Sequence, residues 1–346
     1  MSLFFPEVAP AQSAYNKPPQ NILKVLHAPT LPEFVLSPTR EKIMRVSWEE
    51  YPSIRRVAEP YLKLAGVRLE PKNRSQHDTP GGYGIPPCVQ NISILDISTQ
   101  KEISVHLPQN GCVSDMIWNA DGTRFAFVNA VETSVELWVG DMRGSSKKLD
   151  KIGLNPMLGS TVQWLPDQKN LLVKTIAELA RPLPSATALK GPSIQETDGS
   201  SGESSTYEKR DTLNNKNDED LFESYGTSQL AIVNSETGKI KSIGKPGVYS
   251  YVEASPDGNF ILVRSIQRPY SYITTYANFP HHMEIWTREG QKTPIAKLPL
   301  RDRIPIHGVP TGPRAFSWRS TDRATLLWTE ALDGGYWNVN VPFLDK

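Results

Sequence analysis

The most informative pattern in the chain is a short apolar strand, a turn built on aspartate, and a second apolar strand. It is clearest in residues 113–140, where an Asp-Gly pair at 121–122 separates two such runs and residues 135–139 alternate between apolar and other side chains. Alternation with a period of two predicts a strand. Asp-Gly between two β-rich runs predicts a tight turn, because glycine adopts a positive φ at little steric cost. The stretch therefore predicts neighbouring antiparallel strands.

This unit recurs along the chain. Equivalent aspartates, each followed by an apolar run, are Asp167, Asp257 and Asp322, and a weaker copy begins at Ser37. A recurrence of about 40–50 residues with four short strands is the sequence signature of propeller blades. The alternative is an ordinary β-sandwich with similar hairpins. The pattern favours an all-β fold: a β-propeller of four-stranded antiparallel blades that is incomplete, with about five blade repeats and the last one truncated.

The composition divides the chain into three parts. Residues 1–30 are rich in Pro and Asn and predict an extended N-terminal arm, and residues 31–346 predict the partial propeller. Within it, residues 185–227 are dominated by small and polar side chains. Such a segment buries too little apolar area to offset its ordering entropy, so we expect a mobile insertion. No α/β-hydrolase domain is predicted, and the chain stops partway through a blade.

Two short segments depart from the strand pattern. The end of the insertion, residues 218–225, predicts an amphipathic turn that docks through Leu221, Phe222 and Tyr225. A second short helix is expected just before Pro60, because proline interrupts a helix.

Charge and cysteine content exclude several classes. The net charge is +1, and no apolar run reaches the roughly 18 residues of a membrane span, so neither nucleic acid nor a membrane is an expected partner. The N-terminus has no basic region followed by a long apolar run, so no signal peptide is expected. Two cysteines, Cys88 and Cys112, argue against a disulfide framework. We read them as buried small residues in a reducing compartment.

Motifs that carry chemistry are missing from the sequence. The nearest strings to the Gly-x-Ser-x-Gly elbow of α/β-hydrolases, at 143–146 and 199–202, do not fit it. There is no P-loop and no Rossmann glycine fingerprint. His281 and His282 are adjacent, and neighbours on a strand point to opposite faces, so they make a poor chelate. The sequence thus predicts no catalytic residue, no metal site and no cofactor.

One aromatic connection stands out as a candidate binding loop. Residues 268–280 combine one arginine with three tyrosines and a phenylalanine. Loops held by a rigid scaffold collect binding residues, and an arginine framed by tyrosines can hold a carboxylate. Arg268 and Tyr270 are therefore the predicted substrate contacts. The alternative is that the tyrosines pack and that Arg268 is solvated or forms a structural ion pair.

Several stretches resemble the propeller of the glutamyl endopeptidases, serine peptidases of the prolyl-oligopeptidase type known from chloroplasts and bacteria. The resemblance covers nearly the whole chain up to Gly335. The stretches that carry it include LAGVR at 64–68, VELWV at 135–139, GPSIQE at 191–196, RPYSY at 268–272, EIW at 284–286, GPRAFSWR at 312–319 and ATLLWTEALDGG at 324–335.

The resemblance implies a function without supplying a catalytic site. In that family the propeller gates access to a hydrolase domain with a Ser-Asp-His triad, and no triad residue can be carried over to this chain. The implied function is a truncated N-terminal gating propeller, inactive alone, with peptides or a separate hydrolase domain as partners. The implied location is the bacterial cytoplasm or the chloroplast stroma. The alternative is an independent β-propeller that binds proteins, whereas a periplasmic propeller of the TolB type would require a signal peptide.

Overall fold

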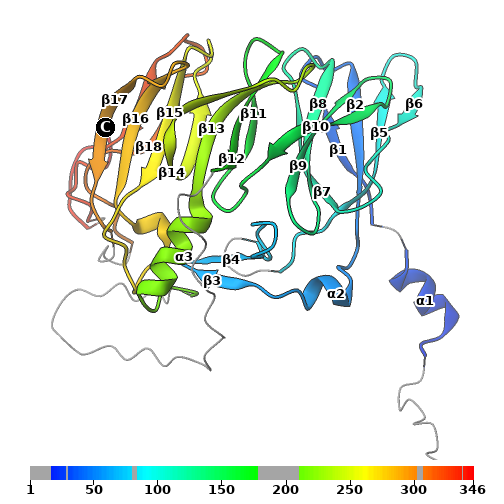
Figure 1. The fold of residues 1–346 in the computed structure, drawn as a ribbon, viewed down its shortest axis with the longest axis horizontal. Helices are drawn as coiled ribbons and strands as arrows, with labels where there is room; N and C mark the ends of the chain where they lie inside the picture. Colours follow the sequence, from blue (N-terminus) through cyan, green and yellow to red (C-terminus); the bar gives the residue numbers. More distant parts are fainter. Residues whose placement is uncertain (1–16, 29, 80–83, 178–209, 302–306, 337) are drawn as a thin grey trace, which may run out of the picture.

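The chain forms a row of antiparallel sheets that fan around a common axis (Figure 1). The computed structural model describes residues 17–28, 30–79, 84–177, 210–301, 307–336 and 338–346. In this part of the chain nearly all regular structure is β, as the alternating pattern predicted.

The strands of each blade follow one another in sequence order. Blades 1 and 2 join into one sheet where β5 pairs with β7, and blades 3 and 4 join into another through β14. Blade 1 contains β1 (Glu33–Leu36), β2 (Lys42–Trp48), β5 (Val89–Asp96) and β6 (Glu102–Ser104). Blade 2 contains β7 (Cys112–Trp118), β8 (Arg124–Ala130), β9 (Val135–Asp141) and β10 (Ser146–Gly153). Blade 3 contains β11 (Val162–Trp164), β12 (Asn170–Ile176), β13 (Thr227–Asn234) and the first part of β14 (Ile240–Ala254). Blade 4 contains the second part of β14, then β15 (Phe260–Ile266), β16 (His281–Thr287) and β17 (Lys292–Leu298). These are the predicted four-stranded antiparallel blades.

The recurring aspartates make the turn between the first and second strands of a blade. The carboxylates of Asp121, Asp167 and Asp257 each accept a hydrogen bond from the backbone N–H two residues later, at 2.9–3.0 Å. Such Asx interactions imitate a backbone turn and leave room for a left-handed residue. Gly122 and Gly258 occupy that position, with φ of 68° and 70°. The repeat found in the sequence is thus a repeat of turn chemistry.

Equivalent blades also share a charged anchor on their outer half. In blade 2 the indole N–H of Trp138 donates to Glu136 at 2.9 Å, and Lys148 of the next strand pairs with the same carboxylate at 2.8 Å. Blade 4 repeats this arrangement around Glu284 and Trp286, where the indole-to-carboxylate distance is 2.8 Å. The repetition of side-chain contacts supports the blade assignment independently of the turns.

Among the described residues the last blade, blade 5, contains two strands, β18 (Arg314–Trp318) and β19 (Leu326–Thr329). The residues after β19 pair with the C-terminal tail: the backbones of Glu330 and Lys346 exchange two hydrogen bonds of 3.0 Å. Leu327 and Trp328 remain about half exposed on β19. The tail therefore covers only the end of a short edge.

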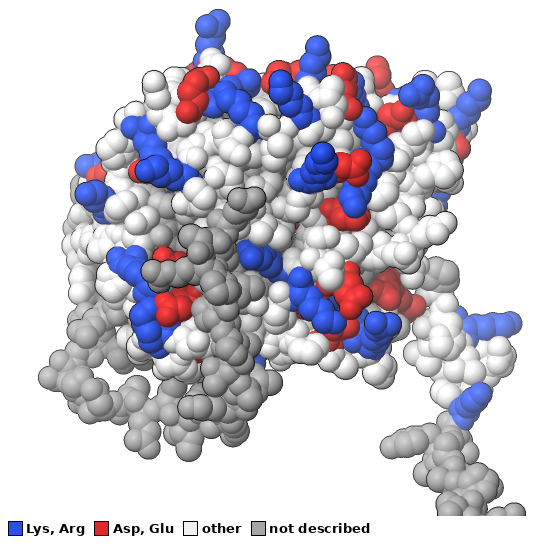
Figure 2. Space-filling model, in the orientation of Figure 1, with Lys and Arg blue, Asp and Glu red and all other residues white. Residues whose placement is uncertain are grey.

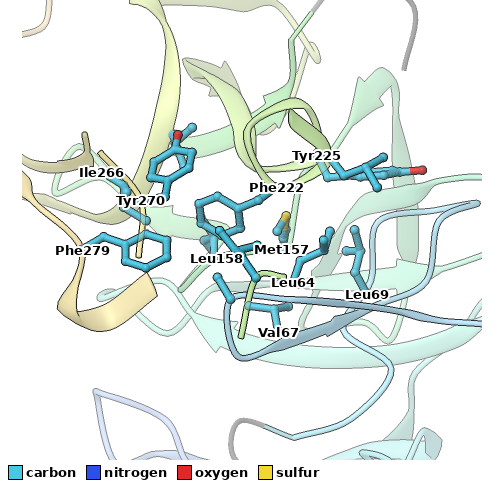
Figure 3. Packing of buried hydrophobic residues seen from close by; sticks show 14 residues of the cluster. Leu64, Val67, Leu69, Met157, Leu158, Phe222, Tyr225, Ile266, Tyr270 and Phe279 are labelled. Carbon is cyan, nitrogen blue, oxygen red and sulfur yellow. The ribbon is translucent and has the colours of Figure 1, made fainter. Parts of the chain in front are cut away.

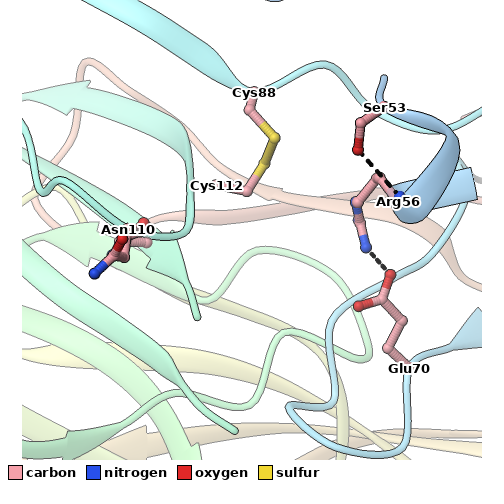
Figure 4. The surroundings of a disulfide bond; sticks show 7 residues. Ser53, Arg56, Glu70, Cys88, Asn110 and Cys112 are labelled. Atoms are coloured by element: carbon pink, nitrogen blue, oxygen red, sulfur yellow. Dashed lines mark hydrogen bonds and ion pairs between the residues drawn. A yellow bond between two sulfur atoms is a disulfide. The ribbon is translucent and has the colours of Figure 1, made fainter. Parts of the chain in front are cut away.

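The prediction for the cysteines was wrong, because Cys88 and Cys112 form a disulfide (Figure 4). Val89 of β5 pairs with Val113 of β7, where blades 1 and 2 meet, and this register brings the two preceding Cα atoms to 5.0 Å. That distance suits a disulfide. The cysteines are 24 residues apart in sequence. Only the contact between two blades makes them neighbours, and a cysteine count does not encode that contact.

Helices are few and lie outside the blades. They are α1 (Gln20–Leu26), α2 (Ile54–Val57), α3 (Lys216–Gly226) and the 3₁₀ turn η1 (Tyr276–Asn278). The expected helix before Pro60 is α2, which Ser53 caps by accepting from the N–H of Arg56. Helix α1 lies within the predicted extended arm and buries none of its residues. Among the described helices none is long and apolar enough to cross a membrane.

Candidate functional site

Three long connections meet at one end of the propeller. Each follows the second strand of a blade, in blades 1, 3 and 4, and their described parts are residues 49–79, 210–226 and 267–280. They contribute α2, the hairpin of β3 (Leu62–Leu64) and β4 (Val67–Leu69), α3 and η1, all at the lower end in Figure 1. We call this end the capped end. The aspartate turns lie at the opposite end, because antiparallel strands reverse direction between them.

The capped end has a hydrophobic core of its own (Figure 3). Phe222 of α3 lies at its centre, with ring centroids 5.3 Å from Tyr270 and 5.7 Å from Phe279 in edge-to-face contacts. Leu221, Phe222 and Tyr225 are buried, which confirms that this segment docks through them. The amphipathic segment forms a full helix rather than a turn, capped by Asn215, whose side chain accepts from the N–H of Asp218. Residues 185–209 of the predicted insertion lie outside the described residues.

Arg268 lies on the surface of the cap against α3. Its Nε donates to Glu223 at 3.0 Å, its Nη2 lies 3.4 Å from Asp220, and its Nη1 pairs with Glu219. The pKa of Arg268 is raised, although burial lowers it, because Glu223 and Glu219 hydrogen-bond to the guanidinium. The sequence placed Arg268 in a binding loop, and the structure places it in an ion-pair network of its own chain.

Tyr270 packs beneath that arginine. Its ring is stacked on Phe279 at 5.3 Å, the guanidinium carbon of Arg268 lies 4.5 Å from the ring centroid, and the side chain is buried. Burial raises the pKa of Tyr270, so it is a neutral phenol. Both residues thus have structural contacts, which was the alternative for this loop. Their contact with a peptide stays a prediction.

A partly buried ionic group, which sequence reasoning missed, ties β4 to the segment before α3. Arg68 donates to Asp78 and to Asp211, both at 2.7 Å, and hydrogen bonding to Asp211 raises the pKa of Arg68. Asp211 is 143 residues away in sequence, so no local spacing could reveal this group. It holds the first and second connections of the capped end together.

A second polar group surrounds His77. Its ring stacks on Tyr61 with centroids 4.5 Å apart, and its Nδ1 lies 3.0 Å from Glu70. Glu70 also pairs with Arg56 of α2 (Figure 4). Desolvation, followed by the charge of Arg56, lowers the pKa of His77, so the imidazole is neutral near pH 7. The carboxylate of Glu70 thus bridges α2 and the loop after β4.

Lys174 of β12 is a deeply buried ionisable group. Its Nζ donates to the carbonyl of Leu158, and desolvation lowers the pKa of Lys174 to about 7. It follows the apolar run 171–173 on a strand that is buried on both faces. A continuous apolar run is typical of a strand buried on both sides. A lysine directly after such a run was therefore the sequence signal that this charge would be buried.

The opposite end carries a cavity of about 510 Å³. It lies beside the aspartate turns of successive blades, and its walls are mainly aromatic and proline side chains. The residues that line it include Pro38, Trp118, Trp164, Pro166 and Pro256. Trp164 donates to the carbonyl of Ile117 at 3.2 Å, whereas the buried indole N–H of Trp118 has no hydrogen-bond partner. This cavity is apolar and contains no ionisable side chain.

Polar groups of the capped end hold one another in place, as the 3.0 Å contact between Nδ1 of His77 and Glu70 shows. No group of three or more His, Cys, Asp or Glu side chains in the described part of the chain could hold a metal ion. Positive and negative side chains are interspersed on the face drawn in Figure 2, in keeping with the net charge of +1.

Sequence comparison finds relatives among plant peptidases. The chain is 34% identical to a protein of Oryza sativa subsp. japonica named probable glutamyl endopeptidase, chloroplastic, over 96% of this chain and 36% of that protein. A protein of the same name from Arabidopsis thaliana is 32% identical over 93% of this chain and 34% of its own length. The chain thus spans about a third of the curated relatives that it matches. No family model matches it.

Structure comparison finds weak likenesses. The acylaminoacyl peptidase of Pyrococcus horikoshii aligns with 74% of this chain and 31% of its own, at 13% identity and a TM-score of 0.39. The β-propeller domain of the Trilobed protease from Pyrococcus furiosus aligns with 78% of this chain and 58% of its own, at 12% identity and a TM-score of 0.40.

Proposed function

We propose, from its relationship to about a third of the length of the glutamyl endopeptidases, that this chain is the substrate-gating propeller of a peptidase of that kind. The observation that carries the proposal is 34% identity over 96% of the chain to a protein of that name. In this proposal the chain supplies no catalytic residue. Hydrolysis belongs to a hydrolase domain with a Ser-Asp-His triad, on which the propeller lies as a cover that admits peptides. The proposed location is the chloroplast stroma or the bacterial cytoplasm.

The capped end is the face that we assign to the hydrolase domain. Two features support this. The N-terminal segment with α1 leaves the propeller at that end (Figure 1), and three blades send their long connections there. In α1, Ile22, Val25 and Leu26 are about half exposed or more and bury nothing. An apolar helix without a packing partner in its own blades is suited to an interface between domains.

A binding experiment with two matched arginine variants tests the assignment of faces. The hydrolase domain of the rice relative is expressed separately, and its affinity for the 346-residue chain is measured by calorimetry. Arg268 lies at the capped end, and Arg288 lies at the opposite end, 3.5 Å from Asp167. We expect association that is weakened by Arg268→Ala and unchanged by Arg288→Ala. The absence of association, or weakening by Arg288→Ala alone, would contradict the proposal.

Gating itself requires an activity measurement. The separate hydrolase domain is offered a short glutamate-containing peptide and an unfolded protein, each with and without the 346-residue chain. We expect the chain to suppress cleavage of the protein much more than cleavage of the peptide, because a cover excludes large substrates. The chain alone should hydrolyse neither substrate. Hydrolysis by the chain alone that a serine-directed reagent inhibits would overturn the proposal.

An independent protein-binding propeller is the second candidate, and one observation favours it. The apolar cavity of about 510 Å³ lies at the end away from the cap, and Trp118 presents a buried donor there without a partner. This candidate would be favoured if the chain is a stable monomer that does not bind the hydrolase domain, and if Trp118→Ala abolishes its binding to a captured partner protein. Loss of hydrolase binding on Arg268→Ala would favour the first.

A further inference from the structure

A small pocket between blades 4 and 5 is lined by three arginines. Its volume is about 150 Å³. One wall is the face of blade 4 where Tyr251, Arg264 and Met283 are successive cross-strand neighbours. The other is the start of β18, with Arg314 and Phe316. Arg301 and Leu298 close it beside η1, so the pocket opens near the capped end.

Arg264 brings a charge into this wall without a carboxylate partner. Its Nε donates to the hydroxyl of Ser250 at 3.1 Å, and its guanidinium carbon lies 5.7 Å from the ring centroid of Tyr251. Burial, and then the charge of Arg301, lower the pKa of Arg264. None of the ion pairs found among the described residues includes Arg264 or Arg301. Both guanidinium groups line the pocket, and neither has a carboxylate partner among the ion pairs of the described residues.

Arg301 and Arg314 leave donors unused there. Nη2 of Arg301 donates to the carbonyl of Ala277 at 2.9 Å, but its Nε is buried and has no hydrogen-bond partner. Nη2 of Arg314 pairs with Asp345, and its Nη1 is likewise buried without a partner. A buried charged donor without an acceptor carries its full desolvation penalty. Two such donors on neighbouring residues indicate a missing acceptor.

The other titratable groups near the pocket do not supply that acceptor. His281 at the start of β16 is fully buried, and desolvation, followed by Arg264 and Arg301, lowers the pKa of His281 to about 3. It is therefore neutral and adds no charge. Burial raises the pKa of Tyr276, which is a neutral phenol. Asp345, about half exposed, is the one carboxylate paired with a lining arginine among the described residues.

We propose that this pocket is a binding site for one small oxyanion, a carboxylate or a phosphate group, held by Arg264, Arg301 and Arg314. The group would accept from guanidinium N–H groups of these three arginines, all of which line the pocket. Planar guanidinium groups match the oxygen atoms of both anions. The apolar walls formed by Met283, Leu298 and Phe316 exclude a large ligand. Ala315 lines the same pocket with φ at 51°, a left-handed conformation that is uncommon for alanine.

Anion titrations at constant ionic strength test the site. The 346-residue chain is titrated calorimetrically with sodium phosphate and, separately, with sodium acetate, while sodium chloride keeps the ionic strength fixed. We expect one equivalent of at least one oxyanion to bind and to raise the midpoint of thermal unfolding above its value in chloride. The tighter anion identifies the group: phosphate indicates a phosphate-bearing ligand and acetate a carboxylate.

Arginine variants locate the binding. Arg301→Gln should raise the dissociation constant at least tenfold. Arg288 is a partly exposed arginine at the other end, and Arg288→Gln should leave the constant unchanged. If Arg301→Gln does not fold, Arg314→Gln provides the same comparison. The proposal is overturned if neither oxyanion binds more tightly than chloride. It is equally overturned if a folded Arg301→Gln or Arg314→Gln variant binds like the unchanged chain. None of these outcomes depends on the presence of a hydrolase domain.

Discussion

Replacing Lys174 by methionine should stabilise the protein at acid and neutral pH. The side chain is 2% exposed, and its Nζ has one acceptor, the carbonyl of Leu158. Burial lowers the pKa of Lys174 from 10.5 to about 7. At 1.36 kcal/mol per pH unit, that difference corresponds to about 5 kcal/mol against the charged form. Leaving the carbonyl without its donor costs about 1–3 kcal/mol. We therefore expect Lys174→Met to gain about 2–4 kcal/mol at pH 6.

The gain should vanish at alkaline pH. Between pH 7 and 10.5 the unfolded chain binds a proton at Lys174 that the folded chain does not, so the unfolding free energy of the unchanged protein rises with pH across this window. Below pH 7 both states are protonated and the whole penalty remains. Urea unfolding followed by tryptophan fluorescence at pH 6, 8 and 10 measures this, with the exposed Lys169→Met as control. If the difference in unfolding free energy between Lys174→Met and the unchanged protein is the same at all three pH values, the reasoning is refuted.

Three further perturbations have defined outcomes. Reducing Cys88–Cys112, or replacing both by serine, should lower the unfolding free energy by about 3 kcal/mol because the bond closes a loop of 24 residues; equal denaturation midpoints with and without reductant would exclude this. Phe222→Ala should cost about 3–5 kcal/mol in a thermal or urea melt because the ring is fully buried among aromatic neighbours, whereas a smaller loss would mean that the capped end collapses around the gap. Arg268→Ala should lower the unfolding free energy by only about 1 kcal/mol, and by less in high salt, because its ion pairs are partly exposed. A loss that does not change with salt would instead indicate that packing against Tyr270 matters.

The blades could be predicted because their information is local. Each aspartate turn and the alternation around it lie within about ten residues of sequence, and the turn bonds of Asp121 and Asp257 span two residues. The docking of the amphipathic segment at 218–225 was predicted for the same reason, since its buried side chains recur at helical spacing, although the segment forms a full helix and not the expected turn.

The cap and its charges could not be predicted because they depend on contacts between connections of different blades. Arg68 and Asp211 are 143 residues apart, and Arg268 and Glu223 are 45 residues apart. The aromatic loop was recognised as unusual, but its sequence could not show that α3 would supply carboxylates to Arg268. The disulfide was missed for a related reason, since its cysteines meet only where blade 1 touches blade 2.

The buried cations of blades 3 and 4, however, do have a local signal in the sequence. Lys174 and Arg264 occupy the same position in their blades, seven residues after the turn aspartates at 167 and 257, on strands that are otherwise apolar. Burial disfavours the charged form of Lys174, and the side chain responds with a lowered pKa, because an ammonium group can lose its proton. Its Nζ also donates to a carbonyl. A guanidinium group cannot, so Arg264 requires an anion in its surroundings. Equivalent positions in one repeat thus lead to different outcomes, a buried lysine with a lowered pKa in blade 3 and the proposed anion site in blade 4. It follows that Arg264→Lys should fold stably without added anion, because the lysine can then deprotonate as Lys174 does.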